Sequence, residues 1–392
     1  MNKRSVRDLD VRGKRVLVRV DFNVPIRDGR VVDDARIERA LPTIRYLLER
    51  GARPALISHL GRPKGEPDPE CTMDPVAIRL EELLGVPVLK LDTAVGREVE
   101  EALAAFSEGI VLLENSRFYP GEMKNDPEFS EQLASPFDLY VDDAFGVAHR
   151  AHATTVGVAN LLPAAAGLLM EEELDYLDRI RLHPQRPFVA ILGGAKVSDK
   201  LRVMQSMLEV ADALLIGGAM CFTFFKAKGL ETGNSLVEED YLEEAKHLMS
   251  EAGEKLVLPV DLVVAEMMEE GAPSKLVRVE EFPPGLMGLD IGPETVEEFK
   301  SYISRAKTIF WNGPMGVFEV DAFAKGTEGV ARAVAESEAL SVGGGGDLVA
   351  AVRKLGLEDE MSFISTGGGA SLEYVEGREL PGVAVLPDKE RS

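Results

Sequence analysis

The feature that most constrains the fold is the alternation of strand-like and helix-like segments along the chain. Short runs of β-branched and other apolar residues predict strands, and between several of them apolar residues recur at helical spacing. This alternation is typical of parallel sheets, because parallel strands are joined by crossover helices. The predicted strands are 15–20, 54–58, 86–90, 109–113, 139–142, 188–192, 213–216, 255–259, 308–311, 340–342 and 362–364, and the predicted helices include 35–50, 75–84 and 97–106.

A single helical segment, 169–181, separates two halves that both show this rhythm. The whole chain of 392 residues is longer than one hydrophobic core usually supports, so we expect two domains. The prediction is an α/β protein with two doubly wound, Rossmann-like parallel-sheet domains. Their boundaries are 1–168 for the first, 169–181 for a bridging helix and 182–377 for the second. The tail, about 378–392, is expected to form a strand at 383–386 and to pack back on the first domain.

The charge balance narrows the classes of partner. Residues 1–168 hold 22 basic and 27 acidic residues (net −5), and residues 169–392 hold 22 and 40 (net −18). So acidic a chain repels nucleic acid, and any anion site must concentrate cations locally. No apolar run reaches the length of a membrane span, and no secretory signal is visible. We expect a cytoplasmic protein, monomeric, with neither nucleic-acid nor membrane partners.

Cationic and polar side chains follow the predicted strands of the first half. One arginine after a strand is usually solvated surface, but the carboxyl ends of parallel strands lie on one edge, where several arginines would converge. The planar guanidinium suits phosphate and carboxylate, while shorter polar groups suit hydroxyls. The implied ligand is a small, highly anionic, hydroxylated acid. The candidate residues are Asp21, Asn23, Arg36, His59, Arg62, Arg117 and Arg150.

Glycine clusters follow the strands of the second half, at 193–194, 217–218, 343–346 and 367–369. Some of them are expected to be tight turns, but glycines between a strand and a helix also expose backbone N–H groups to an anion. Neither a P-loop nor a dinucleotide fingerprint is present. Lys196 and Lys200, four residues apart at a predicted helix start, are expected to share one face. Asp347 follows four glycines and suits Mg²⁺, a hard ion that prefers oxygen ligands.

Several longer motifs then indicate a family, because in this order they resemble phosphoglycerate kinase from end to end. The resemblance implies reversible phosphoryl transfer between 1,3-bisphosphoglycerate and ADP, with Mg²⁺, giving 3-phosphoglycerate and ATP in glycolysis. The motifs are DFNVP (21–25), HLGRPKG (59–65), LLEN with RF (112–118), DAFG with AHRAH (142–152), GGAKVSDK (193–200), GLDIGP (288–293), WNGPMGVFE (311–319), GGGD (344–347) and STGGGASLE (365–373).

The same resemblance implies roles for individual residues. The seven candidates of the first half would hold the glycerate. The nucleotide and its metal would be held by Gly193, Lys196, Lys200, Gly288, Pro314, Glu319, Gly345, Gly346 and Asp347. One position departs from the family, since Leu348 stands where the family usually has serine or threonine. The chain therefore lacks one hydroxyl ligand for the nucleotide, and Leu348→Thr is expected to lower the Michaelis constant for it.

Phosphoryl transfer of this kind depends on positioning and charge stabilisation, so no covalent residue is expected. We assign Arg36 and Lys200 to the equatorial oxygens of the transferred group and the amides of Gly367, Gly368 and Gly369 to a helix N-terminus beneath it. His59 is then a binder. Because the acid-binding and nucleotide-binding residues fall on opposite sides of the bridging helix, catalysis is expected to require domain closure, with bending near 167 and 371–377.

Two other functions fit the sequence less well. A non-catalytic two-lobed receptor for a phosphorylated acid would account for the arginines, but not for Lys196, Lys200 and Asp347 together. A dehydrogenase fits less well, because the dinucleotide fingerprint is missing.

Overall fold

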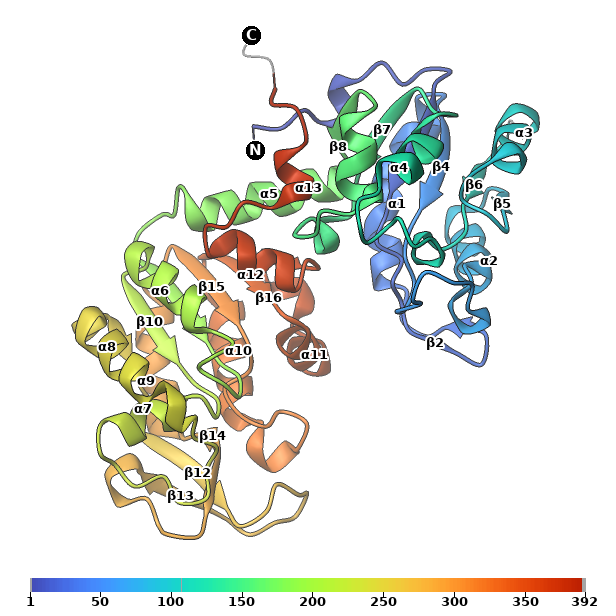
Figure 1. The fold of residues 1–392 in the computed structure, drawn as a ribbon. Coiled ribbons are helices and arrows are strands. Elements are labelled where there is room, and N and C mark those ends of the chain that lie inside the picture. Colours follow the sequence, from blue (N-terminus) through green and yellow to red (C-terminus); the bar gives the residue numbers. More distant parts are fainter. Residues whose placement is uncertain (1, 107, 390–392) are drawn as a thin grey trace. The chain divides into compact units, whose positions relative to one another are not determined.

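The computed structural model describes residues 2–106 and 108–389, and the chain divides into two compact units (Figure 1). The first comprises Met1–Asp175 with Glu379–Ser392, and the second comprises Tyr176–Arg378. Each unit contains a six-stranded parallel sheet. An α/β fold with two doubly wound parallel sheets was predicted, and this prediction is confirmed.

The sheet of the first unit has β1 near its centre, paired in parallel with β4 and β7. Four of the five residues of β1 are buried, as expected for a strand covered on both faces. β8 was not predicted, because it is a short run of alanines, which have low β propensity. In spatial order the strands are β5 (Val88–Lys90), β6 (Ile110–Leu112), β4 (Arg53–Ile57), β1 (Arg15–Arg19), β7 (Leu139–Asp142) and β8 (Ala164–Ala166).

In the sheet of the second unit, the first strand along the chain, β9, lies in the middle and later strands lie on both sides of it. The chain moves outward through β10 to β11, then returns to the other side of β9 and moves outward from β15 to β17. Because parallel crossovers are right-handed, this reversal puts the two sets of helices on opposite faces and creates a switch point between β9 and β15. In spatial order the strands are β11 (Leu256–Val257), β10 (Ala213–Ile216), β9 (Phe188–Leu192), β15 (Thr308–Asn312), β16 (Leu340–Gly344) and β17 (Phe363–Ser365).

Two smaller antiparallel elements were not predicted. The second unit carries a three-stranded sheet in the order β13 (Ser274–Arg278), β12 (Asp261–Ala265), β14 (Met287–Ile291), and the first unit a hairpin of β2 (Ile26–Arg27) and β3 (Arg30–Val31). β13 is largely exposed and therefore shows no apolar run in the sequence. Hairpin strands of two residues are too short for a period to be visible.

Helices occupy the connections between the strands (Figure 1). The predicted bridging helix is one continuous element, α5 (Leu168–Arg181), and the division between the two units falls within it at Asp175. Its apolar side chains Leu174, Leu177 and Ile180 are buried. The other helices are α1 (Ala35–Glu49), α2 (Asp74–Leu84), α3 (Arg97–Ala105), α4 (Pro127–Ala134), α6 (Leu201–Val210), α7 (Cys221–Ala227), α8 (Leu242–Ala252), α9 (Pro293–Ile303), α10 (Lys325–Ala335), α11 (Gly346–Lys354), α12 (Gly369–Val375) and α13 (Pro381–Ala384).

The prediction of a strand at 383–386 is wrong, because residues 383 and 384 belong to the short helix α13. Pro381 occupies the first helical position, where its fixed φ favours a helix and its missing N–H is not needed. Val383 and Leu386 are both buried, three residues apart, which is helical rather than strand spacing.

The described part of the tail is bonded to the first unit. The amide of Gly382 donates to the carbonyl of Ala148 at 2.8 Å, and the amide of Arg4 donates to the carbonyl of Pro387 at 2.8 Å. Residues 390–392, which also belong to the predicted tail, lie outside the described residues.

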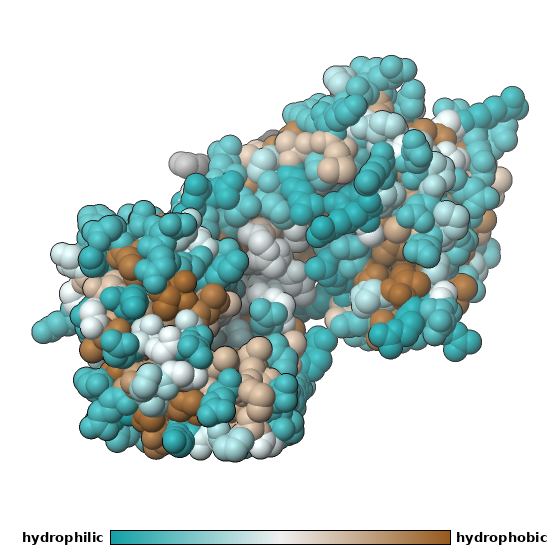
Figure 2. Space-filling model, turned by 60° about the horizontal axis from the view of Figure 1, so that its bottom comes forward, coloured by the Kyte–Doolittle hydropathy of each residue, from teal (hydrophilic) through white to brown (hydrophobic). Residues whose placement is uncertain are grey.

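Hydrophilic residues dominate the face drawn in Figure 2, with hydrophobic patches between them. Among the described residues, no helix has both the length and the apolar character needed to cross a membrane.

Candidate functional site

In the first unit, the predicted polar residues lie in the loops that leave the carboxyl ends of neighbouring strands. Asp21 and Asn23 follow β1, His59 and Arg62 follow β4, and Arg150 follows β7. Arg117 lies in the 3₁₀ turn that follows β6, and Arg36 is the second residue of α1. The strand order β6-β4-β1-β7 brings these loops to the same edge of the sheet.

Arg36 is held by a carboxylate of the same edge. Its Nη1 donates to Oδ2 of Asp21 at 2.8 Å, and 40% of the arginine side chain is exposed. Asp21 therefore orients the guanidinium while most of the arginine's donors remain available to a ligand.

Asn23 and Arg117 hold the loop that carries His59 and Arg62. The amide of Gly61 donates to Oδ1 of Asn23 at 2.9 Å, and Nη1 of Arg117 donates to the carbonyl of Gly61 at 2.6 Å. The Nε of Arg117 is buried and has no hydrogen-bond partner among the described residues. Both side chains are thus partly structural. Arg62, by contrast, is exposed.

His59 reports the electrostatics of this edge. Its imidazole is only 3% exposed, and burial lowers its pKa well below the usual value. The charges of Arg19, Arg117, Arg150 and Arg36 lower that pKa further. Four arginines therefore act on one buried ring, which is consequently neutral at pH 7 and can bind a ligand without carrying charge.

Arg19, the last residue of β1, is a member of this cluster that sequence reasoning missed. It is 1% exposed, donates through Nε to Oγ1 of Thr154 at 2.9 Å, and places Nη2 3.1 Å from Nδ1 of His59. The available signal was an arginine inside an apolar strand of a parallel sheet, since arginine is rarely fully buried without partners.

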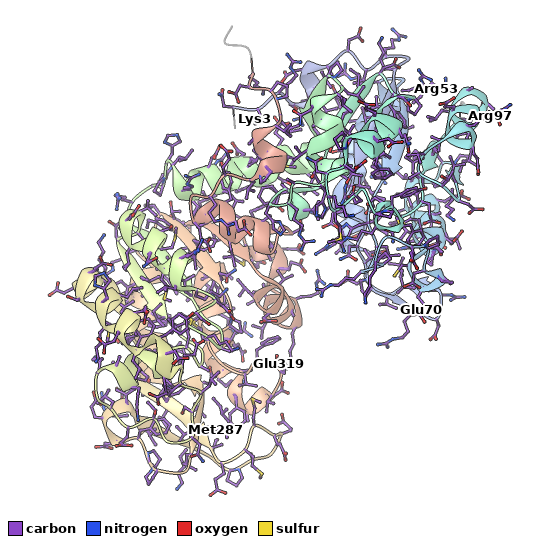
Figure 3. All side chains as sticks on the ribbon, in the orientation of Figure 1. Lys3, Arg53, Glu70, Arg97, Met287 and Glu319 are labelled. Atoms are coloured by element: carbon purple, nitrogen blue, oxygen red, sulfur yellow. The ribbon has the colours of Figure 1, made fainter. Side chains whose placement is uncertain are left out.

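The second unit contains a cavity of about 740 Å³ at the carboxyl ends of its strands. Loops that follow β9, β10 and β15 line it, as does β14, and this is the switch point of the sheet. Four predicted nucleotide residues, Gly288, Pro314, Glu319 and Asp347, are among its lining. Figure 3 labels Glu319 together with Met287, another lining residue.

Apolar side chains form much of the cavity wall, and they were not predicted. They include Phe222, Leu236 and Leu289. A side chain at Gly288 would place its Cβ 2.0 Å from Cζ of Phe222, so only glycine leaves room for the phenyl ring. An apolar slot beside a glycine-rich edge suits the heterocyclic base of a nucleotide.

Lys200 precedes α6 as its N-cap residue, and its ammonium donates to Oδ1 of Asn312 at the end of β15. Burial lowers the pKa of Lys200, and the charges of Asp199, Asp347 and Glu376 partly oppose this. Asn312, which sequence reasoning did not single out, also donates through Nδ2 to the carbonyl of Gly344 at 2.6 Å.

The shared helical face expected for Lys196 and Lys200 is wrong. The helix α6 begins only at Leu201, so both lysines precede it, and Lys196 is an exposed residue of the connecting loop. The loop that carries both lysines starts with a close backbone contact, since a Cβ at Gly193 would lie 2.0 Å from the carbonyl oxygen of Pro314.

Two helices begin at glycine clusters, and the start at 367–369 was predicted. Gly345, with φ of +100°, precedes α11, which begins at Gly346, and Gly368, with φ of +54°, precedes α12, which begins at Gly369. Such φ values favour glycine. The first backbone N–H groups of a helix have no partner within it and can bind an anion. Gly367 donates its N–H to Oγ of Ser365 at 3.1 Å.

Asp347 and its neighbour Leu348 face different surroundings. Asp347 is exposed and lines the cavity, whereas Leu348 is 1% exposed and packs in the hydrophobic core with Trp311 and Met315. The leucine side chain therefore does not stand in for a missing hydroxyl ligand, and only its backbone N–H belongs to the helix start.

The described residues contain no group of three or more His, Cys, Asp or Glu side chains that could hold a metal ion. A single exposed carboxylate still fits Mg²⁺, which proteins often bind through one or two carboxylates and the phosphates of the substrate. Asp347 meets that requirement.

A cationic edge in one doubly wound unit and a cavity with apolar walls in the other define an α/β phosphotransferase of two units. The family model described as phosphoglycerate kinase matches residues 6–378. The chain belongs to the phosphoglycerate kinase family, whose members are glycolytic kinases.

Individual relatives agree with this assignment. The chain is 75% identical over 390 residues to a phosphoglycerate kinase of Rubrobacter xylanophilus, with 100% of both chains covered. It is 55% identical to one of Dictyoglomus turgidum, covering 98% of each. Among solved structures, phosphoglycerate kinase of Coxiella burnetii has a TM-score of 0.91 at 41% identity, and that of Pyrococcus horikoshii has 0.85 at 36%, each covering 98% of both chains.

Proposed function

We propose that this chain transfers the acyl phosphate of 1,3-bisphosphoglycerate reversibly to ADP, giving 3-phosphoglycerate and ATP. The carboxylate group of 3-phosphoglycerate is the acceptor in the reverse direction. The observation that carries the proposal is the chemical division between the sheet edges, one with arginines around His59 and the other with an apolar cavity beside glycine-rich helix starts. Family membership supports the same reaction.

The acid substrate is assigned to the first unit. Arg62, Arg117 and Arg150 supply guanidinium donors to its phosphate and carboxylate, and Asp21 and Asn23 accept from its hydroxyl. Arg36, held by Asp21 at 2.8 Å, supplies charge to the transferred phosphoryl group. Arginine suits this work because its fork donates two parallel hydrogen bonds.

The nucleotide is assigned to the second unit. Its base lies between Gly288, Phe222 and the other apolar walls, with Pro314 and Glu319 lining the same cavity. Its phosphates contact the glycine-rich loops and helix starts, from Gly193 to Lys196 and at Gly345, Gly346 and the backbone of Leu348. Mg²⁺, held by Asp347, would neutralise phosphate charge and orient the oxygens.

In-line transfer requires no covalent residue in the protein. Lys200, oriented by Asn312, donates to the equatorial oxygens of the transferred group, and the amides of Gly367, Gly368 and Gly369 add partial positive charge. His59 binds the substrate and moves no proton.

A coupled assay of ATP formation from ADP and 1,3-bisphosphoglycerate tests the function directly. We expect Mg²⁺-dependent ATP formation that requires both substrates. Binding of both ligands without ATP formation would contradict the proposal and would indicate a receptor for a phosphorylated acid.

We further propose that catalysis requires closure of the two units, in a monomer that works in the cytoplasm. The reacting atoms must approach within about 3 to 3.5 Å, yet the substrates must enter and water must be excluded. Small-angle scattering should give a smaller radius of gyration with 3-phosphoglycerate and Mg-nucleotide together than with neither. An unchanged radius with both ligands bound would contradict closure, and the mass from the same scattering curves tests the monomer.

A further inference from the structure

Glu122 is a fully buried carboxylate to which the proposed mechanism gives no role. It accepts three hydrogen bonds: from the amide of Thr154 at 3.0 Å, from the hydroxyl of Thr154 at 2.6 Å and from the hydroxyl of Ser116 at 3.2 Å. Thr154 is likewise fully buried. Two of the three donors of Glu122 therefore come from one threonine.

The hydroxyl of Thr154 has a defined direction. Its oxygen accepts from Nε of Arg19 at 2.9 Å, and because a guanidinium can only donate, the hydroxyl proton is left for Glu122. The threonine therefore links the buried carboxylate to the buried guanidinium and fixes the orientation of that guanidinium.

The Nη2 group of Arg19 determines which ring nitrogen of His59 carries the proton. This nitrogen lies 3.1 Å from Nδ1 of the imidazole and can only donate, so Nδ1 accepts and the proton of the neutral ring lies on Nε2. The alternative tautomer would place two N–H groups against each other at this distance.

We propose that Glu122, Thr154 and Arg19 form a positioning relay that holds His59 as the neutral Nε2–H tautomer, presenting a hydrogen-bond donor to the anionic substrate. The contact with substrate rests on the proposed function, whereas the tautomer is a property of the free protein. The relay lies entirely within the first unit.

The charges around His59 support a neutral ring. Arg19 approaches from β1, Arg36 from α1, and Arg117 and Arg150 from the loops after β6 and β7. Burial and these four charges lower the pKa of His59, and the nearest carboxylate, Asp21, lies 3.9 Å from Nδ1. The ring is neutral at pH 7 because of its burial and these charges. The relay therefore determines the tautomer of the ring and not its charge.

His152 does not replace Arg19 as the partner of Glu122. Its Nδ1 lies 3.8 Å from Oε1 of Glu122, but burial, followed by the charges of Arg19, Arg117, Arg150 and the neighbouring His149, lowers the pKa of His152 to about 4. At neutral pH this histidine is uncharged, so the charge that Glu122 opposes is that of the arginines.

The test is Thr154→Val, which keeps the shape of the side chain and removes the hydroxyl. Nitrogen-15 NMR of the imidazole should show the Nε2–H tautomer in the parent protein and a mixture of tautomers in the variant. The KM for 3-phosphoglycerate should rise about fivefold, as for one neutral hydrogen bond, with kcat little changed. Thr154→Ser should restore both.

A matched control is Ser130→Ala, which removes another buried hydroxyl of this unit, one that donates to the backbone carbonyl of Asp126 at 2.8 Å. It should leave the tautomer and KM unchanged. If Thr154→Val does not fold, Thr154→Ala serves instead, because it removes the same hydroxyl without placing a second methyl group beside Glu122.

The outcomes separate the relay from the proposed function. A parental tautomer in a folded Thr154→Val or Thr154→Ala variant overturns the relay even if the enzyme is active. A changed tautomer that Thr154→Ser restores supports the relay even if no kinase activity is found, in which case only the proposed function fails.

Discussion

The two parallel sheets present chemically different carboxyl edges. In the first unit, long cationic side chains such as Arg36 and Arg117 surround a neutral histidine. In the second unit, glycine-rich backbone and apolar walls form a cavity that Asp347 lines, and the charge of Asp347 acts on Lys200. The strands are arranged in similar parallel sheets, so the difference comes from the loops.

We propose that the two edges hold phosphate in different ways. Residues 1–168, with a net charge of −5, contain enough arginines to form a local cationic cluster. Residues 169–392 have a net charge of −18, and we expect them to rely more on backbone N–H groups, which carry partial positive charge without a cationic side chain. We expect the first edge to be sensitive to single side-chain changes and the second to depend more on backbone geometry.

The largest effect should come from Arg36→Ala. The variant lacks the guanidinium that we assign to the transferred phosphoryl group. We therefore expect kcat to fall about 10³-fold, as for other arginines that act on phosphoryl transfer. The fold should survive, because the side chain is partly exposed and outside the core. The coupled assay and circular dichroism measure the two effects.

Arg45→Ala is the control for Arg36→Ala, because Arg45 is an exposed arginine of the same helix that bonds to the carbonyl of Leu83. It should retain parental kcat. Equal losses in the two variants would mean that α1, and not the position of Arg36, is responsible.

The next prediction concerns the stability of the hydrophobic core of the second unit, in which Leu348 packs. Leu348→Thr replaces a buried side chain with a smaller one and buries a hydroxyl, so the free energy of unfolding should fall by about 2–4 kcal/mol. Denaturant titration measures this. Because Leu348 is buried, we expect Leu348→Thr to lower stability, and we no longer expect it to improve nucleotide binding.

Leu276→Thr provides the matched control, since Leu276 is 56% exposed on β13 of the same unit, and it should cost little. A stable Leu348→Thr variant with a lower KM for the nucleotide would support the hydroxyl hypothesis instead.

A smaller effect is expected from Asp347→Asn, which removes the carboxylate assigned to Mg²⁺ without changing its size. The Mg²⁺ concentration for half-maximal activity should rise at least about tenfold, because loss of a residue that only supports a metal ligand already costs that much. Asp359→Asn, at an exposed acid of the same unit, should leave it unchanged. Equal Mg²⁺ dependence in all three proteins would place the metal elsewhere.

The last prediction is a pH dependence of stability from the buried acid Asp143. Burial raises its pKa to about 8, although the amides of Leu169 and Met170 donate to its carboxylate. The unfolded value is about 3.9. Between these values unfolding releases a proton, so the free energy of unfolding should fall as pH rises from about 4 to 8 and then level off.

Asp143→Asn should flatten this profile, so its stability relative to the parent should increase with pH across that window. The profile should not become level, because burial also raises the pKa of Asp142 to about 7 and that of Asp290 to about 8. Glu98→Gln, at an exposed acid of α3, should leave the profile as it is. Parallel profiles for Asp143→Asn and the parent would show that Asp143 titrates normally.

Much of the fold could be predicted because its strands are buried on both faces and read as continuous apolar runs. β7, β9 and β10 match their predicted bounds residue for residue. β8 and β13 could not be found, since one is a run of alanines and the other is exposed. The tail was misassigned because apolar residues over so short a segment do not distinguish a strand from a helix.

The candidate site was predictable where it depends on strand ends. Asp21, His59 and Arg117 lie in the loops that follow β1, β4 and β6, on one edge, because parallel strands place their carboxyl ends together. The apolar wall with Phe222 was missed, since an apolar residue lining a cavity has the same sequence signature as one in a core.

The sequence by itself determined the alternation of elements, the residue types at the strand ends and the motifs that indicate the family, because these depend on local order along the chain. Only the tertiary structure decided which side chains meet. Arg19 reaches His59 across 40 residues, and Lys200 reaches Asn312 across 112. Leu348 packs inward while Asp347 beside it is exposed, because the helix rotates successive side chains to different surroundings. Such contacts follow from how the sheets bring distant loops together, which no local pattern encodes.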